Sequence, residues 1–133
     1  MALLSGTDAL GETRRPRPEP GYVAWLGTVQ FASAVTVGEL FLGAYRAAAG
    51  CRDVAMIEDR VVPAVTILPF DAVVAKVYGR FAADLADQEA PLANADLQIS
   101  ATGLHHDLEL VTGNLRHVGR VPGLRIRLLR SST

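Results

Sequence analysis

The stretch ANADLQISATGLHHDLELVTGN, residues 93–114, decides which fold class the sequence predicts. Residues 94–107 predict a helix with Asp96 in its first turn, where the helix dipole favours an acid. The run LELVT at residues 108–112 is short and apolar and is followed by Gly113 and Asn114, which predicts a buried strand. A helix that leads directly into a buried strand is typical of α/β proteins.

The same alternation extends along the rest of the chain. Short apolar segments predict strands at residues 3–4, 31–36, 65–70, 108–112 and 123–129. Helical patterns occur at residues 21–29, 37–50, 51–62, 71–88 and 94–107. Strands that are apolar throughout belong to sheets with both faces covered, so the pattern predicts an α/β domain with a mostly parallel sheet.

The segment 71–88 has the strongest helical pattern. Asp71 is the expected N-cap, and Gly50 is expected to end the helix at residues 37–50 from a C′ position. The apolar stripe of the segment consists of Val73, Val74, Val77, Tyr78, Phe81 and Leu85.

Composition limits the possible functions. A chain of 133 residues predicts one domain over residues 1–133. Thirteen basic and fourteen acidic residues give a net charge of −1, so nucleic-acid binding requires a local patch, for which Arg14, Arg15 and Arg17 are the densest basic run. The lone Cys51 excludes an internal disulfide. With no leader pattern and no apolar run of membrane-spanning length, we expect a cytoplasmic protein that does not bind membranes.

Polar residues follow the predicted strands at positions that suit a metal site. Asp8 follows the first strand, Glu39 the second, and Asn114 the fourth, while Asp96 opens the helix before the fourth strand. The carboxyl ends of parallel strands meet at one edge, where ligands bind. Clustered carboxylates repel one another, and a hard cation such as Mg²⁺ or Mn²⁺ relieves that repulsion.

Each of these residues also has a purely structural explanation. The sequence from Thr36 to Glu39 fits a capping box, in which Glu39 would satisfy only the start of its own helix. Asp96 could serve the helix dipole beside an Asn94 cap, and Asn114 could be a turn residue.

Four segments resemble PIN-domain ribonucleases of the VapC toxin type. They occur in the order and spacing of that family, from about residue 14 to residue 127: RRPRPEPGYVAWL, SAVTVGELFLGA, PLANADLQISATGL and LELVTGNLRHVGRVPGLRI. The resemblance implies a three-layer α/β/α sandwich with a central parallel sheet of five strands. It also implies a Mg²⁺- or Mn²⁺-dependent endoribonuclease that forms homodimers and is inhibited by a cognate VapB-like antitoxin.

The resemblance also assigns roles to individual residues. Glu39 matches the glutamate of the family's helix, and Asp96 matches the aspartate before its later helix. Thr112 and Asn114 match a T-x-N pattern that replaces a fourth acid in many members. With Asp8, these residues give the expected catalytic set of Asp8, Glu39, Asp96 and Asn114, of which the three acids are the expected metal ligands.

The beginning of the chain departs from the family pattern. The family reads LLDTNVL, in which the aspartate at the end of the first strand is a principal metal ligand, whereas this chain reads LLSGTDALGET. Counting from the arginine run puts Gly6 at that position, and counting from Leu3 and Leu4 puts Ser5 there. Neither supplies a carboxylate, and Asp8 is the nearest acid that could substitute.

Two functions follow from this departure. The first is an active metal-dependent ribonuclease, and the second is a catalytically impaired PIN-domain protein that retains dimer and antitoxin binding. The aromatic side chains expected to contribute exposed contacts are Phe41, Tyr45, Tyr78 and Phe81, with a core position as the alternative, above all for Phe81.

Overall fold

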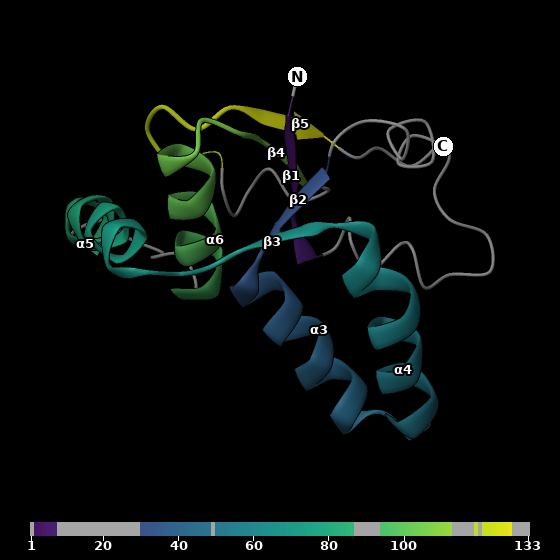
Figure 1. Ribbon diagram of the computed structural model, residues 1–133. Helices are drawn as coiled ribbons and strands as arrows, with labels where there is room; N and C mark the ends of the chain where they lie inside the picture. The colour runs from purple at the N-terminus through teal and green to yellow at the C-terminus, as the bar shows by residue number, and fades with distance from the viewer. Residues whose placement is uncertain are drawn as a thin grey trace.

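The computed structural model describes residues 2–7, 30–48, 50–86, 94–112, 119 and 121–128. One parallel sheet of five strands has the order β3-β2-β1-β4-β5, with β1 in the centre (Figure 1). The strands are β1 (Leu3–Ser5), β2 (Gln30–Ser33), β3 (Thr66–Leu68), β4 (Glu109–Thr112) and β5 (Ile126–Leu128). The predicted parallel sheet and its five strands are therefore confirmed.

Helices cover both faces of this sheet, as the α/β/α prediction requires. The helical elements are α3 (Ala34–Arg46), α4 (Gly50–Met56), the π-helical turn η2 (Ile57–Val61), the 3₁₀ turn η3 (Val62–Ala64), α5 (Ala72–Ala86) and α6 (Asn94–His105). Helix α6 packs on one face of the sheet, and α5 packs against α6. Helices α3 and α4 lie side by side (Figure 1) and form a core with η2 and Ala32 of β2.

The face under α6 is built from one row of strand residues. The row consists of register partners on neighbouring strands: Phe31 of β2, Leu4 of β1, Leu110 of β4 and Ile126 of β5. They pack with Ile99 of α6. A Cβ on Gly103 would lie 3.3 Å from Leu124 Cδ1 and 3.4 Å from Leu4 Cδ2. The glycine therefore lets α6 approach this row closely.

The predicted boundaries at both ends of α3 are wrong. The segment 31–36 is not all strand, because β2 ends at Ser33 and α3 begins at Ala34. The Ser33 side chain accepts a hydrogen bond from the Val35 amide at 3.1 Å and so starts the helix three residues before the predicted position. Gly50 does not end α3, which stops at Arg46; it begins α4. A Cβ on Gly50 would lie 3.0 Å from the Ala44 carbonyl oxygen, so the glycine allows α4 to pack against the end of α3.

The predictions for α5 are confirmed with one exception. Asp71 Oδ1 accepts a hydrogen bond from the Val74 amide at 3.1 Å, as expected of an N-cap. Val74, Phe81 and Leu85 are buried, whereas Val73 is 54% exposed and does not belong to the buried stripe. The predicted helix at residues 21–29 lies outside the described residues.

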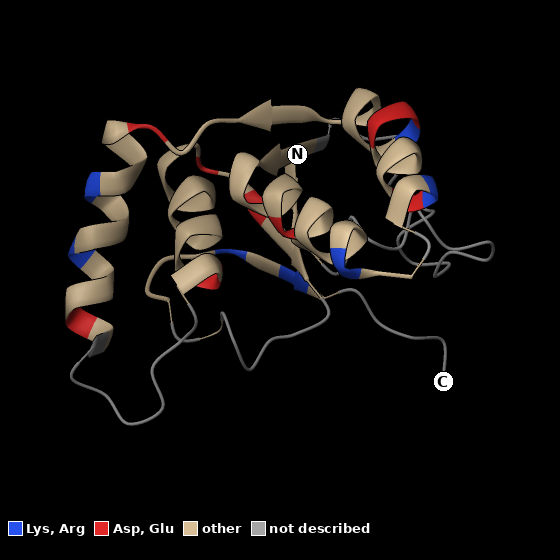
Figure 2. Ribbon diagram, turned by 90° about the horizontal axis from the view of Figure 1, so that it is seen from below, with Lys and Arg blue, Asp and Glu red and all other residues tan. Residues whose placement is uncertain are grey.

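The distribution of charged residues and the hydropathy of the helices can both be followed in the structure. Acidic and basic residues are interspersed over the described helices and strands (Figure 2). None of the helices in the described ranges is both long and apolar enough to cross a bilayer.

Candidate functional site

The carboxyl ends of the strands meet along one edge of the sheet. Ser5 is level with Ala32 of β2 and Val111 of β4, so Gly6 is level with Ser33 and Thr112. The Gly6 amide donates a hydrogen bond to the Val111 carbonyl oxygen at 2.9 Å, which extends the pairing of β1 with β4 one residue beyond the strand. Gly6, Ser33 and Thr112 therefore form one row at the end of the central strands.

Glu39 reaches this edge from α3. Its Oε1 accepts a hydrogen bond from Thr7 Oγ1 at 2.5 Å, and the two residues are 32 positions apart in the chain. The second predicted acidic position therefore lies against the end of the central strand.

The capping-box explanation of Glu39 is wrong. The N-cap of α3 is Ser33, which places Thr36 inside the first turn and Glu39 in the second turn. Glu39 is thus too far along the helix to satisfy its free amides.

Asp96 lies in the first turn of α6, as predicted. Residues 106–108 join α6 to β4, so the helix runs back across the sheet and begins at the carboxyl edge. Ile99 packs against Leu4 in the sheet centre, and Asp96 is almost one turn nearer the edge. Its carbonyl oxygen accepts a hydrogen bond from Ser100 Oγ at 2.8 Å, and Asn94 Oδ1 accepts one from the Tyr78 hydroxyl at 3.3 Å. A first-turn position agrees both with the dipole explanation and with a role at the edge.

Buried hydroxyl groups surround the same edge. The hydroxyl-bearing residues at the strand ends and the start of α3 are all buried: Ser5, Ser33, Thr36 and Thr112. Among the described residues, Thr36 Oγ1 is buried without a hydrogen-bond partner. Thr36 is three residues before Glu39 and shares its face of α3. An unpaired buried hydroxyl is unfavourable by roughly 1–3 kcal/mol.

The position that departs from the family pattern lies at the centre of this edge. Ser5 is fully buried within β1, and Gly6 is the first residue after it, in the row with Ser33 and Thr112. Neither residue carries a charge. Asp8, Asn114 and the three arginines Arg14, Arg15 and Arg17 lie outside the described residues.

The donor atoms at the edge fit a hard cation in kind. Glu39 and Asp96 supply carboxylates, and the surrounding side chains supply hydroxyl oxygens, which suit Mg²⁺ or Mn²⁺. Within the described ranges, no group of three or more His, Cys, Asp or Glu side chains is arranged to hold a metal. The described part of the edge thus provides two candidate acidic ligands, Glu39 and Asp96.

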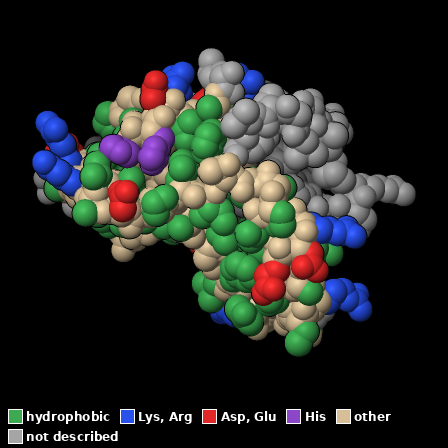
Figure 3. Space-filling model, in the orientation of Figure 1, with side chains coloured by type: hydrophobic (Ala, Val, Ile, Leu, Met, Phe, Trp, Pro, Cys, Tyr) green, Lys and Arg blue, Asp and Glu red, His purple; other side chains and the backbone are tan. Residues whose placement is uncertain are grey.

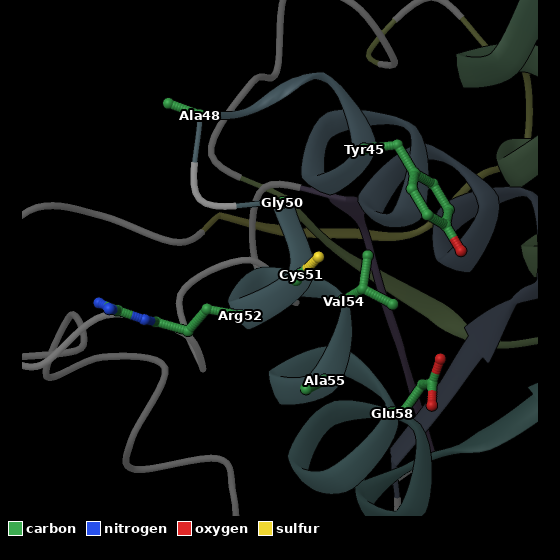
Figure 4. Close-up of a pocket in the computed structure, with 8 residues that line it drawn as sticks. All are labelled: Tyr45, Ala48, Gly50, Cys51, Arg52, Val54, Ala55 and Glu58. Atoms are coloured by element: carbon green, nitrogen blue, oxygen red, sulfur yellow. The ribbon is translucent and has the colours of Figure 1, made fainter.

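A separate pocket lies between the end of α3 and α4. Its volume is ≈ 620 Å³, and Tyr45, Cys51, Val54 and Glu58 are among the residues that line it (Figure 4). Glu39 and Asp96 are not part of its lining. The pocket is therefore distinct from the carboxyl edge.

The four aromatic residues expected at exposed contacts differ in burial. Tyr45 is 71% exposed, as expected. Phe81 is 7% exposed and belongs to the core, which is the alternative expected from the sequence for this residue. Phe41 and Tyr78 are partly buried. Leu42, beside Phe41, is 57% exposed, and hydrophobic side chains gather over the α3–α4 region (Figure 3).

Thr7 is the residue at this edge that sequence reasoning did not assign. It follows the first strand, which marks it only as near the edge. Nothing in the sequence connects it with Glu39, because the contact depends on how α3 leaves β2.

Comparison with known proteins identifies relatives along most of the chain. No protein-family model matches. The toxin FitB of Neisseria gonorrhoeae is 33% identical over 119 residues, which cover 83% of this chain and 86% of FitB. The tRNA(fMet)-specific endonuclease VapC of Salmonella typhimurium is 33% identical over 94 residues, 71% of this chain and 70% of that protein.

Solved structures agree with these relatives. DNA-bound VapBC from Salmonella typhimurium contains a chain with a TM-score of 0.87 and 26% identity, covering 98% of this chain and 99% of that chain. FitAcB from Neisseria gonorrhoeae contains a chain with a TM-score of 0.76 and 31% identity, covering 95% and 96% of the two chains. The parallel sheet and its helices thus define a PIN-like α/β protein. The chain belongs to the family of VapC-type PIN-domain toxins.

Proposed function

We propose that this chain is a metal-dependent endoribonuclease, the toxin of a pair whose cognate VapB-like antitoxin keeps it inactive. The observation that supports this most directly is the hydrogen bond from Thr7 to Glu39, which joins the end of the central strand to the acidic residue of α3. Family membership supports the same function, since a relative is named as a tRNA-specific endonuclease and another as a ribonuclease.

The acidic residues would hold the divalent ion, and the ion in turn would bind the substrate phosphate. Glu39 and Asp96 are the proposed ligands from the two helices, with Asp8 as the third. Asn114 would take the place of a fourth acid beside Thr112. When bound, Mg²⁺ or Mn²⁺ activates a water and stabilises charge on a phosphodiester. The proposal also includes that the side chains of Glu39 and Asp96 face each other across one cleft, with Asn114 at the edge of that cleft.

An impaired nuclease is the second candidate function, and a specific position favours it. Gly6 occupies the row at the strand ends without supplying a carboxylate. Fewer charged ligands bind a divalent ion more weakly. The chain as it stands would then have weak activity but keep its antitoxin and dimer contacts.

Cleavage of RNA by the purified toxin, free of antitoxin, tests the first function. We expect cleavage that requires Mg²⁺ or Mn²⁺ and falls at least about 100-fold in Asp96→Asn, which retains the shape of the side chain but loses the charge. Cleavage that survives both chelation and Asp96→Asn would contradict the proposal. Cleavage by Gly6→Asp but not by the unmodified chain would support the impaired nuclease.

The proposed protein partners are a second copy of the chain and the antitoxin. The exposed Leu42 and Tyr45 on α3, beside the pocket that Tyr45 and Val54 line, form the described surface best suited to such contacts. A soluble, cytoplasmic toxin is consistent with these partners. A strictly monomeric species in sedimentation at micromolar concentration would argue against the homodimer.

A further inference from the structure

We infer that Thr7 is a positioning residue, which fixes the carboxylate of Glu39 for the binding of a divalent cation. This inference rests on the proposed function, because it concerns how one proposed ligand is held. It adds a residue to which neither the sequence nor the family resemblance assigns a role.

The contact is a direct hydrogen bond between two side chains that are distant in the sequence. Thr7 Oγ1 donates to Glu39 Oε1 at 2.5 Å, and both side chains are partly buried. Partial burial reduces competition from water and so strengthens a charge-assisted hydrogen bond. The bond engages Glu39 Oε1, so the second carboxylate oxygen, Oε2, is the one we expect to act as the ligand.

Both sides of the contact are attached to rigid elements. The hydrogen bond from the Gly6 amide to Val111 fixes the backbone immediately before Thr7. Threonine is β-branched, which restricts its χ1 rotamers and limits where the hydroxyl can point. Glu39 lies on α3, whose start is fixed by the Ser33 cap directly after β2.

A fixed glutamate should bind an ion more tightly than a free one. A glutamate side chain has several rotatable bonds, and ordering them on binding is unfavourable in entropy. The hydrogen bond to Thr7 orders Glu39 before the ion arrives. This matters more in a chain with Gly6 at the strand end, because the remaining carboxylates carry a larger share of the binding.

The neighbouring threonine does not have this role. Thr36 lies on the same face of α3, but its buried Oγ1 makes no hydrogen bond among the described residues, to Glu39 or to any other group. Thr7 is therefore the hydroxyl that holds the carboxylate.

Free Mn²⁺ counted by electron paramagnetic resonance in the full-length, antitoxin-free protein tests the inference. Thr7→Val removes the hydroxyl and keeps the shape, and we expect it to weaken Mn²⁺ binding about tenfold, as is common for residues that orient metal ligands. Thr7→Ser should restore binding to within about threefold of the unmodified chain, because it keeps the donor. Thermal unfolding of the three metal-free proteins checks that each one is folded before Mn²⁺ is added.

Two further variants separate the possible explanations. Thr102→Val is the matched control, since Thr102 is fully buried but donates to the Gln98 carbonyl oxygen within α6, and it should bind Mn²⁺ like the unmodified chain. In a Glu39→Gln background, Thr7→Val should cause no additional loss, because its effect passes through Glu39.

The outcomes distinguish this inference from the proposed function. Normal Mn²⁺ binding by Thr7→Val, together with weak binding by Glu39→Gln, would overturn the role of Thr7 and leave the metal site intact. An undiminished loss from Thr7→Val in the Glu39→Gln background would also overturn it. If Glu39→Gln bound Mn²⁺ normally, the proposed metal site would fail and the inference with it.

Discussion

The two ends of strand β1 are equally inaccessible to solvent but bury different kinds of group. Leu3 and Leu4 at its start are 2% and 0% exposed and are apolar, and Leu4 packs against α6 and β4. Ser5 at its end is also 0% exposed, and it is followed by Gly6 and by Thr7 with its bond to Glu39. The first half therefore stabilises the sheet, whereas the second half presents polar groups at its edge. Substitutions in the two halves should accordingly affect different properties.

The largest effect on stability is expected in the apolar row to which Leu4, at the start of β1, belongs. Leu110 is the register partner of Leu4 and is 1% exposed. Leu110→Ala should lower the free energy of unfolding by about 3 kcal/mol, because it removes buried methyl groups and leaves a cavity. Urea denaturation measures this, with Leu42→Ala at a 57% exposed position as the control. A loss as small as that of the control would break the distinction between the two halves.

A smaller loss is expected where α6 approaches the same apolar row. Gly103→Val should lower the free energy of unfolding by about 2 kcal/mol, because the new side chain overlaps Leu124 and Leu4. Gly43→Val on α3 is the matched control, since a Cβ there meets nothing within 4 Å. Equal effects of the two substitutions in thermal unfolding would show that helix propensity, and not close packing, determines the result.

The smallest effect, with the opposite sign, is expected at the start of α3, beside the polar end of β1. Thr36→Val removes a buried hydroxyl without a partner among the described residues and should raise the free energy of unfolding by about 1 kcal/mol. If the hydroxyl serves the proposed site, RNA cleavage should fall in the same variant. A clear loss of stability would mean that the Thr36 hydroxyl is part of the packing, and the comparison would no longer separate the two halves.

The order of helices and strands could be predicted because apolar runs and helical periodicity depend on which residues are buried. Boundaries were less predictable where two signals compete. Ala34, Val35 and Thr36 continue the apolar run of β2 and suggest a strand, but the Ser33 cap begins a helix there. Glycine is common just after the end of a helix, which suggests that role for Gly50. Its close approach to Ala44 becomes visible only when α3 and α4 are packed together.

The candidate site was predictable to the extent that topology determines it. A parallel sheet brings to one edge the residues after successive strands and the starts of the helices that lead back into it, so Glu39 and Asp96 could be selected from their positions in the chain. Which carboxylate oxygen is held, and by which residue, depends on side-chain packing between segments 32 residues apart. The hydrogen bond between Thr7 and Glu39 therefore could not be predicted from the sequence.

The central claim is that the carboxyl edge is a divalent-metal site weakened by Gly6. Calorimetric titration of Mn²⁺ into the unmodified chain, Gly6→Asp and Asp8→Asn tests it most directly. The account predicts weak binding by the unmodified chain and binding at least about tenfold tighter by Gly6→Asp, because the added carboxylate joins the row with Ser33 and Thr112. Asp8→Asn should weaken binding only if Asp8 has replaced the missing aspartate. Tight binding by the unmodified chain that survives Asp8→Asn would contradict the account, since it would show that the site never needed a carboxylate at this position.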